Sequence, residues 1–500
     1  MTQAAIHPHE TGARARFGDR TFPLGWLVAG LVAMLAAQQF LLWQFLGHMP
    51  PWAWLIGLVA LAGFCALLLR LPGWSREHSP SLKLFAAGVA LSAILFVLGG
   101  EGRLFYANTD WQVRNSVLHD LVEYPWPYVY TVRATPDLLR APLGMYLAPA
   151  LAGKALGQDA AQWALVLQNS LFLGALLALG STLFAAGRPR WIALGVFIGF
   201  SGMDILGAML AGLRLSGHLE WWNVAQFSST VTLAYWVPQH ALAGWAGALL
   251  FLLWRENRIP LAAFLVPLPL LAIWSPLGLM GAIPFAAFAG IEALVRRRLT
   301  VADFLMPFAT ALFAVPGLLY LAAGSGAVGG QANQLPLSAY IALEIIDVVP
   351  ILLAVAFQRP RFGNAAFALV AVLLLAAPFG QVGHHQDFPM RFSIAPLAVL
   401  ALMAGDALIR WRTTPRPFWR AVLIVVLAIG LATPLSETRR AIVYPPAPRM
   451  LCSYFGMVPG GADTYVTPLA TVPRLIAPPH PALIRPVDPA RCYAGEWPDP

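Results

Sequence analysis

Length, composition and charge already exclude a water-soluble protein. The chain has 500 residues, of which 59% are hydrophobic, with 18 tryptophans and a mean hydropathy of +0.67. The net charge of +9 would suggest a nucleic-acid partner in a soluble protein, but the basic residues lie in short loops between apolar runs, a pattern that sets orientation in a membrane. We therefore expect membrane lipids, and no nucleic acid, as partners.

The apolar runs predict the fold class. They recur at lengths of roughly 18 to 22 residues, which is what a helix needs to cross a hydrocarbon core about 30 Å thick. They predict an all-α polytopic membrane protein with about 13 transmembrane helices. These spans are expected near residues 24–45, 53–70, 83–99, 164–186, 191–212, 238–253, 259–275, 277–294, 302–323, 337–357, 363–380, 392–409 and 418–433.

Basic residues indicate the orientation of these spans. The N-terminus and the loops assigned to the cytoplasm contain 19 of the 32 Lys and Arg residues, whereas the outer loops before residue 434 contain seven. This favours a bacterial inner-membrane protein with a cytoplasmic N-terminus and a periplasmic C-terminus. The assignment depends on the WSPLG break between 259–275 and 277–294, because a single kinked span there would invert everything after it.

Two domains are expected. Residues 1–433 form the transmembrane domain, in which a long first periplasmic loop at 100–163 would be catalytic and carry interfacial helices. One of these is predicted at 141–156, a run too short to span that contains Lys154. Residues 434–500 form a small Pro-rich periplasmic tail, in which a disulfide between Cys452 and Cys492 would fit an oxidising compartment.

The segment from Glu101 to Arg140 concentrates the polar chemistry. It holds five carboxylates, one imidazole and four arginines. Asp110 adjoins Trp111 and precedes Arg114 by one turn, so that a carboxylate, an aromatic ring and a cation lie together. A partly buried carboxylate can act as a base, and arginines bind phosphate. The alternative is that Asp110 caps the helix that begins at Trp111.

Acids within spans are a second signal. Each costs on the order of 2.5 to 3.5 kcal/mol to insert, so such residues usually mark a pathway or a site. The sequence places Asp406 near the cytoplasmic end, in an ordinary i,i+4 pair with Arg410. The other three are expected toward the outer face, and they are Asp204, Glu344 and Asp347.

Two later external segments add polar residues to the outer face. His240 follows Pro238 and Gln239 at the mouth of a helix, where a site role and a capping role both remain open. The loop 380–392 is either part of the site or simply solvated, and it carries His384, His385, Asp387 and Arg391.

No metal ligand set is assigned from the sequence. The histidines and aspartate of the 380–392 loop match no standard transition-metal motif. An Mg or Mn ion held by Asp110 together with Asp120 or Asp387 is left open, because hard cations accept carboxylates from separate segments.

A family resemblance accompanies these residues. A long external loop with an acidic residue after Asn108 and Thr109, an interfacial helix and about a dozen spans resembles the GT-C superfamily of membrane glycosyltransferases. The resemblance implies transfer of a sugar from a polyprenyl-phosphate-linked donor, with Asp110 as base or metal ligand. Three segments also look like stretches of uncharacterised bacterial polytopic membrane proteins: DWQVRNSVLHDLVEYPWP, FSGMDILG and YWVPQHALAGW.

On this interpretation, catalysis is assigned to Asp110, Asp120 and His240. Substrate binding is assigned to Arg103, Trp111, Arg114, His119, His385, Asp387 and Arg391. Two other functions remain open. One is a transporter or flippase of a lipid-linked or anionic solute, which would favour internal repeats and midplane acids. The other is a ligase or polymerase of lipid-linked glycans, which would use the 380–392 loop.

Overall fold

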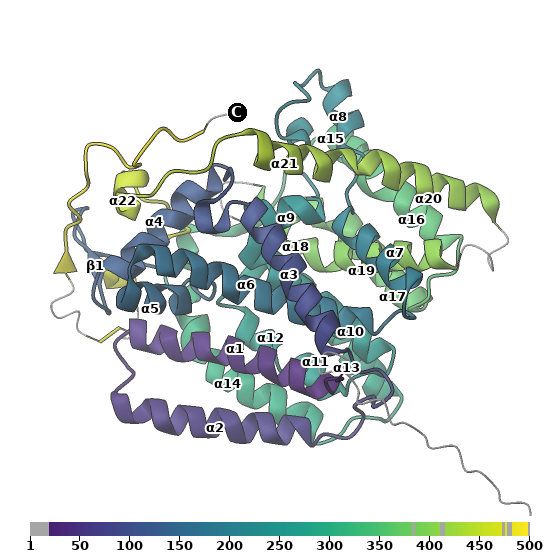
Figure 1. Ribbon diagram of the computed structural model, residues 1–500, viewed down its shortest axis with the longest axis horizontal. Helices are drawn as coiled ribbons and strands as arrows, with labels where there is room; N and C mark the ends of the chain where they lie inside the picture. The colour runs from purple at the N-terminus through teal and green to yellow at the C-terminus, as the bar shows by residue number, and fades with distance from the viewer. Residues whose placement is uncertain (1–19, 383–385, 411–415, 473–475, 478–482, 499–500) are drawn as a thin grey trace, which may run out of the picture.

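The computed structural model describes residues 20–382, 386–410, 416–472, 476–477 and 483–498. Most of these residues are helical (Figure 1). Within them, seven helical stretches are long and apolar enough to cross a membrane: α1 (Leu24–Phe45), α2 (Pro51–Leu69), α6 (Gln158–Ser181), α13 (Pro276–Val295), α14 (Ala302–Ala322), Leu337–Ala356 and Pro417–Val443. These stretches indicate a multi-pass membrane protein.

Two of the seven stretches are composite. Leu337–Ala356 consists of α15 (Leu337–Leu343), the π-helical turn η5 (Glu344–Val348) and α16 (Val349–Ala356). Pro417–Val443 consists of α20 (Pro417–Gly430) and α21 (Ala432–Val443).

The other apolar runs form shorter or less apolar helices, so helix length does not show the full set of predicted spans. The helices are α3 (Leu82–Leu98), α7 (Arg188–Ile198), α8 (Asp204–Leu210), α10 (Pro238–Arg255), α11 (Leu261–Leu265), α12 (Leu268–Leu271), α17 (Asn364–Ala376) and α19 (Ile394–Ile409). The run at 191–212 breaks between α7 and α8, where Gly199 and Gly202 are poor helix formers. The run at 259–275 breaks near Pro267 and Pro269, which lack the amide N–H.

Short elements fill the connections. The helical ones are η2 (Glu101–Arg103), α4 (Asp110–Glu123), α5 (Leu147–Leu156), η3 (Leu219–Trp222), α9 (Thr230–Trp236), η4 (Ser325–Ala327), η6 (Ala377–Phe379), α18 (Asp387–Phe392), α22 (Tyr454–Met457) and η7 (Leu469–Thr471). The strands are β1 (Val129–Tyr130), β2 (Asp137–Leu139), β3 (Gly330–Ala332), β4 (Gly380–Val382), β5 (Val466–Pro468) and β6 (Leu483–Ile484). Of the helix predicted at 141–156, only Leu147–Leu156 is helical, as α5.

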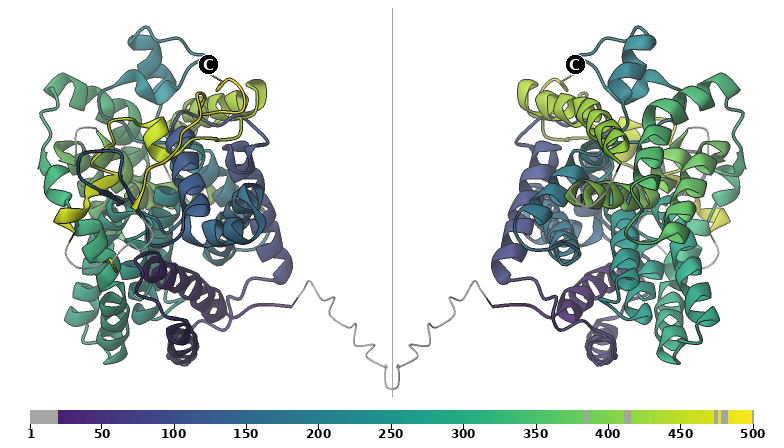
Figure 2. Two further views of the ribbon diagram at one scale, coloured as in Figure 1. Left: turned by 90° about the vertical axis from the view of Figure 1, so that its left-hand side faces the viewer. Right: turned by 90° about the vertical axis from the view of Figure 1, so that its right-hand side faces the viewer.

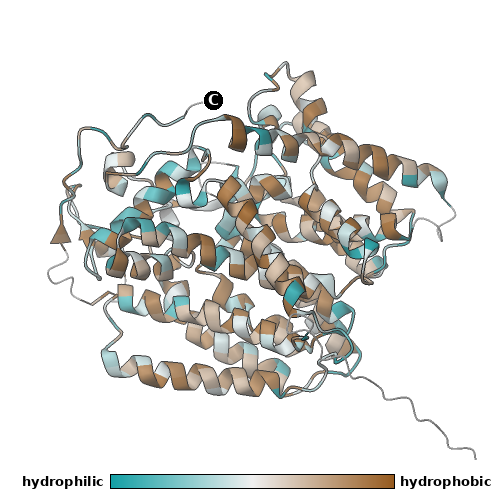
Figure 3. Cartoon of the chain, in the orientation of Figure 1, coloured by the Kyte–Doolittle hydropathy of each residue, from teal (hydrophilic) through white to brown (hydrophobic). Residues whose placement is uncertain are grey.

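The surface of α2 is suited to hydrocarbon. Only 6% of its 18-residue apolar segment is buried, and the side chains of Leu55, Val59 and Leu67 are more than half exposed. Figure 3 shows the same apolar colouring along α2 and much of α14. Because a soluble monomer rarely exposes so large an apolar patch, this surface agrees with a membrane environment.

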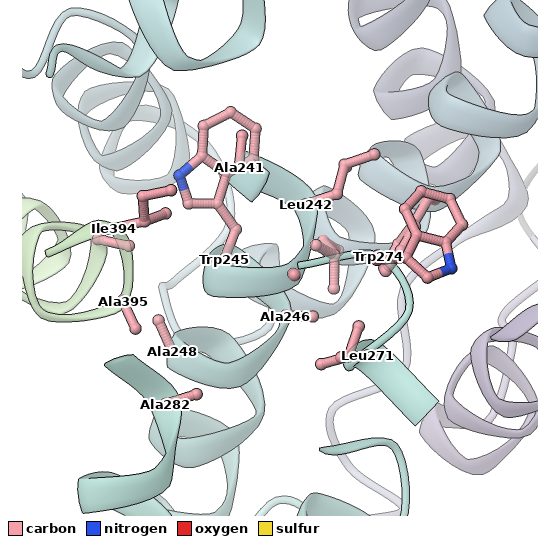
Figure 4. Close-up of a cluster of buried hydrophobic side chains, with 14 of the residues drawn as sticks. Ala241, Leu242, Trp245, Ala246, Ala248, Leu271, Trp274, Ala282, Ile394 and Ala395 are labelled. Carbon is pink, nitrogen blue, oxygen red and sulfur yellow. The ribbon is translucent and has the colours of Figure 1, made fainter. Parts of the chain in front are cut away.

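Helix α10 lies in the core. Every residue from Pro238 to Leu253 is buried, and the helix packs against α13 and α19 (Figure 4). Glycines allow the close approach: a side chain at Gly244 would collide with Ile394, and one at Gly247 with Ala282. The first turn of α10, which contains His240, is therefore held in a fixed position.

Charged loops meet at the C-terminal end of α10. Arg255 pairs with Glu292 at the end of α13, with an Nη1–Oε2 distance of 2.6 Å. Arg361, after α16, donates to Glu256 at 2.6 Å and lies 3.6 Å from Asp406 of α19. Loops expected on one side of the membrane thus lie together.

The chain reverses at the WSPLG break. The amide of Ser75 donates to the Arg258 carbonyl at the basic end, whereas Ser275 hydrogen-bonds His240 at the opposite end of α10. Since α13 then returns to Arg255 through Glu292, residues 261–295 run away from the basic end and back. The break is the expected turn between two stretches and not a kink within one.

At the end opposite the basic loops, the C-terminal tail packs on the segment that follows α3 (Figure 2). A four-stranded sheet has the order β5-β2-β1-β6, so tail strands occupy both edges of the β1–β2 hairpin. Val466 pairs with Leu139 antiparallel, and Leu483 pairs with Val129 parallel. A disulfide joins Cys452 and Cys492, the pair expected from the sequence.

Candidate functional site

Asp110 is the first residue of α4, and other groups do the capping. The Asn108 side chain accepts a hydrogen bond from the Asp110 amide at 3.1 Å and donates to the Tyr235 carbonyl at 2.9 Å. The Trp111 indole donates to the same carbonyl at 2.8 Å. The Asp110 side chain remains 40% exposed, so its carboxylate is accessible for chemistry.

Arg114 lies one turn further along α4 and is buried. Its guanidinium donates to Asp110 Oδ2 and to the Tyr146 hydroxyl, both at 3.3 Å. Its Nε has no hydrogen-bond partner among the described residues. A cation is thus fixed beside a partly exposed carboxylate, and its Nε–H is not used in a hydrogen bond to the described residues.

Tyr465 enters the same region from the tail. Its carbonyl accepts from the Arg140 amide at 2.6 Å, next to the β2–β5 pairing, and its ring stacks on Tyr454. Burial raises the pKa of Tyr465, and four charged groups act on the same hydroxyl: Arg114, Asp110, Arg391 and Asp387. The tail therefore contributes a phenol between charges from two distant segments.

The later residues predicted for the site lie near it. Asp387 and Arg391 pair at 3.0 Å within α18, and Arg391 Nε has no partner among the described residues. His240 is buried and hydrogen-bonds Ser275 Oγ at 2.7 Å. The positive charges of Arg391 and Arg114 act on its imidazole. Segments near residues 110, 240, 390 and 465 thus converge.

Asp120, which the sequence predicts to be catalytic, is held by protein groups. Its carboxylate is fully buried and accepts from the Tyr130 hydroxyl at 2.5 Å and from the Tyr454 amide at 2.9 Å. His119 Nδ1 lies 3.2 Å from the other oxygen. Burial raises the pKa of Asp120, and these donors oppose that shift. The residue fastens α4 to β1 and to the tail.

Two other residues predicted to bind substrate contact protein groups in this structure. Trp111 is 1% exposed because the core and Tyr235 enclose it. Its ring therefore has no free face on which a sugar could stack. Arg103 pairs with Asp159 of α6, which is 71% exposed. The prediction for His385 lies outside the described residues. Among the described residues, no group of three or more His, Cys, Asp or Glu side chains is arranged to hold a metal.

Three groups near the site were not predicted: Tyr146, Tyr465 and Ser275. Tyr146 precedes α5 in an apolar run, and Ser275 is the N-cap of α13. Tyr465 lies in the short TYVT alternation, which is the one local hint of strand β5. No family model, curated protein or solved structure matches the chain.

Proposed function

We propose that the protein is a GT-C type glycosyltransferase. It transfers a sugar from a polyprenyl-phosphate donor to a lipid or glycan acceptor at the periplasmic face of a bacterial inner membrane, with its N-terminus in the cytoplasm. The observation that supports this proposal is the partly exposed Asp110 carboxylate beside the buried Arg114, with Arg391 and Tyr465 brought close from distant segments.

The charges suit a transfer of this kind. The acceptor hydroxyl gives its proton to the Asp110 carboxylate as its oxygen forms a bond to the sugar carbon. The bond from that carbon to the phosphate oxygen breaks, and the polyprenyl phosphate leaves with the electron pair. Arg114 and Arg391 stabilise the negative charge on that phosphate, because guanidiniums bind phosphate through charge-assisted hydrogen bonds.

A lipid-sized groove adds support. An almost wholly apolar cavity of about 540 Å³ lies between α3, α6, α7, α10 and α19, lined by Leu91, Phe197 and Trp245 among others. An apolar groove of this kind can accept part of an isoprenoid chain.

The proposal is tested by Asp110→Asn in purified protein with labelled polyprenyl-phosphate sugars. Transfer is expected to fall by about 10²- to 10⁴-fold, because a general base is removed, while the protein still folds, because an amide oxygen at position 110 can accept from Arg114. The matched control is Asp159→Asn, an exposed acid of α6. Full transfer by the Asp110→Asn protein would contradict the assignment.

A transporter is the second candidate, and one observation favours it. Helix α7 stops at Ile198 and α8 resumes at Asp204, beside the π-helical turn of Leu337–Ala356. Broken helices with buried acids are typical of transporters. Cysteines introduced at 204 and 344 would then be labelled from both sides of the membrane, whereas a transferase predicts labelling from one side at most.

The glycan ligase or polymerase is distinguished within the same assay. Such an enzyme would depend on the loop around Arg391 more than on Asp110. A larger loss of transfer in Arg391→Gln than in Asp110→Asn, with a lipid-linked oligosaccharide as donor, would support it.

A further inference from the structure

A second group of charges lies away from Asp110 and consists of acids. Asp204 begins α8, Glu220 lies in η3, and Glu344 and Asp347 lie in the π-helical turn η5. Asp204, Glu220 and Glu344 all act electrostatically on the Asp347 carboxyl. The four residues are at most 4% exposed.

Two of these acids have hydrogen-bond donors. Asp204 accepts from Ser201 at 2.8 Å, from Thr433 at 2.9 Å and from the Trp222 indole at 3.3 Å. Glu220 accepts from the Ser229 amide at 2.8 Å and from the Gln226 side chain at 3.3 Å. Donors of this kind stabilise the ionised form of a carboxylate.

The other two acids have none. All four side-chain oxygens of Glu344 and Asp347 lack a hydrogen-bond partner among the described residues. The Asp347 carboxyl lies against the backbone of Gly202, at the break between α7 and α8, where an added side chain would collide with it. It is therefore aimed at the unwound backbone next to Asp204.

The charges around Asp347 leave its negative form unbalanced, because the three groups that act on it are all acids. The nearby cations pair with other acids. His218 Nδ1 lies 2.9 Å from Glu437 and its Nε2 lies 3.7 Å from Glu220. Arg440 pairs with Glu437 at 2.8 Å. A buried carboxylate with neither donors nor a counter-ion is strongly disfavoured relative to its neutral form.

We propose that Glu344 and Asp347 form a proton-binding site inside the protein, in which each carboxyl carries a proton in this conformation. The carboxylate oxygen binds the proton and the charge is neutralised. His218, beside Glu220, is a titratable group at the edge of this cluster. The site is independent of the proposed sugar transfer, since none of its residues belongs to the region around Asp110.

Infrared spectroscopy of the purified protein in lipid nanodiscs tests the proposal. At neutral pH, the carbonyl band of protonated carboxyls is expected to lose intensity in Asp347→Asn and in Glu344→Gln. The exposed Glu123→Gln is the matched control and should change nothing. Spectra of wild type minus variant cancel the contribution of other buried acids such as Glu101.

The pH dependence of the melting temperature gives a second readout. These carboxyls are ionised in the unfolded chain above about pH 5, so unfolding releases their protons. The wild-type melting temperature should therefore fall as pH rises from about 5 to about 8, and less so in each variant. An unchanged carbonyl band in both variants would overturn the proposal. The proposal would also be overturned if the melting temperature of the wild type, but not of the variants, were higher in sodium chloride than in choline chloride. That result would show a metal cation bound in place of the proton. If Asp347→Asn does not fold, Glu344→Gln carries both measurements.

Discussion

The region around Asp110 and the acid cluster around Asp347 hold buried charge in opposite ways. At Asp110, two guanidiniums face two carboxylates, and the carboxylate of Asp110 itself is partly exposed. At Asp347, only acids face each other and the two carboxyls of η5 have no donors. A surplus of unused cation donors suits a negatively charged ligand, and unpaired acids suit a positive one. The two regions are therefore expected to bind species of opposite sign.

One network extends from His218, near the acid cluster, to Tyr106, in the segment before Asp110. Glu437 of α21 accepts from His218, Trp236 and Arg440, and Arg440 also donates to the Tyr106 hydroxyl at 3.2 Å. Tyr106 precedes Asn108 and Asp110 in the chain. Changes in this network are expected to have the largest effect on the unfolding free energy.

The largest effect is expected for Glu437→Ala. It leaves Arg440 buried without its carboxylate, and breaking one side of a buried pair costs about 3 to 5 kcal/mol of unfolding free energy. Denaturant unfolding in micelles measures this loss. The double variant Glu437→Ala/Arg440→Ala should lose less than the sum of the single changes, and simple additivity would show that the pair does not interact.

The next effect separates Asp120 from Asp110. Asp120→Asn places an amide against the Tyr130 hydroxyl and the Tyr454 amide, and a loss of about 2 to 3 kcal/mol is expected from the unsatisfied donors. Asp110→Asn keeps an amide oxygen that can accept from Arg114, and the Tyr146 hydroxyl still accepts from the same guanidinium, so the expected loss is smaller, about 1 kcal/mol. Equal stability of the two variants would return Asp120 to the list of catalytic candidates.

A pH-dependent effect follows from Glu101. Burial raises the pKa of Glu101 to about 8, although Asn169 donates to it at 2.7 Å. A carboxyl with a raised folded-state pKa contributes stability that is full below its unfolded value and is lost as pH rises to about 8. The slope is about 1.4 kcal/mol per pH unit for one proton. Melting curves of Glu101→Gln should lack this component, and an identical slope in the variant would refute it.

The smallest effect is expected for Arg103→Gln. Its partner Asp159 is 71% exposed, and exposed ion pairs contribute about 0 to 1 kcal/mol. Both stability and sugar transfer should be close to wild type. A marked loss of transfer with normal stability would support the predicted substrate-binding role of Arg103.

The sequence predicted what depends on local pattern. Apolar runs identified the long helices, and the i,i+4 spacing of Asp110 and Arg114 placed that pair on one face of a helix. Basic loops predicted which connections lie together, and Arg255, Arg361 and Asp406 do so. The tail cysteines were paired correctly because only one partner was available outside the spans.

What the sequence missed depends on contacts between distant residues. Trp111 is buried because the Tyr235 carbonyl, more than 120 residues away, accepts its indole hydrogen. Asp120 is linked to the tail because the Tyr454 amide donates to it. The breaks at 199–203 and in η5 arise where Gly202 and Asp347 pack together, which no single-helix pattern reveals.

The sheet around β1 and β2 has a consequence for assembly. Both edges of this hairpin are occupied by strands synthesised more than 320 residues later. Until β5 and β6 have docked, the hairpin exposes unpaired backbone groups, which are a template for pairing with other chains. Docking of the tail strands therefore also protects the hairpin from pairing with other chains.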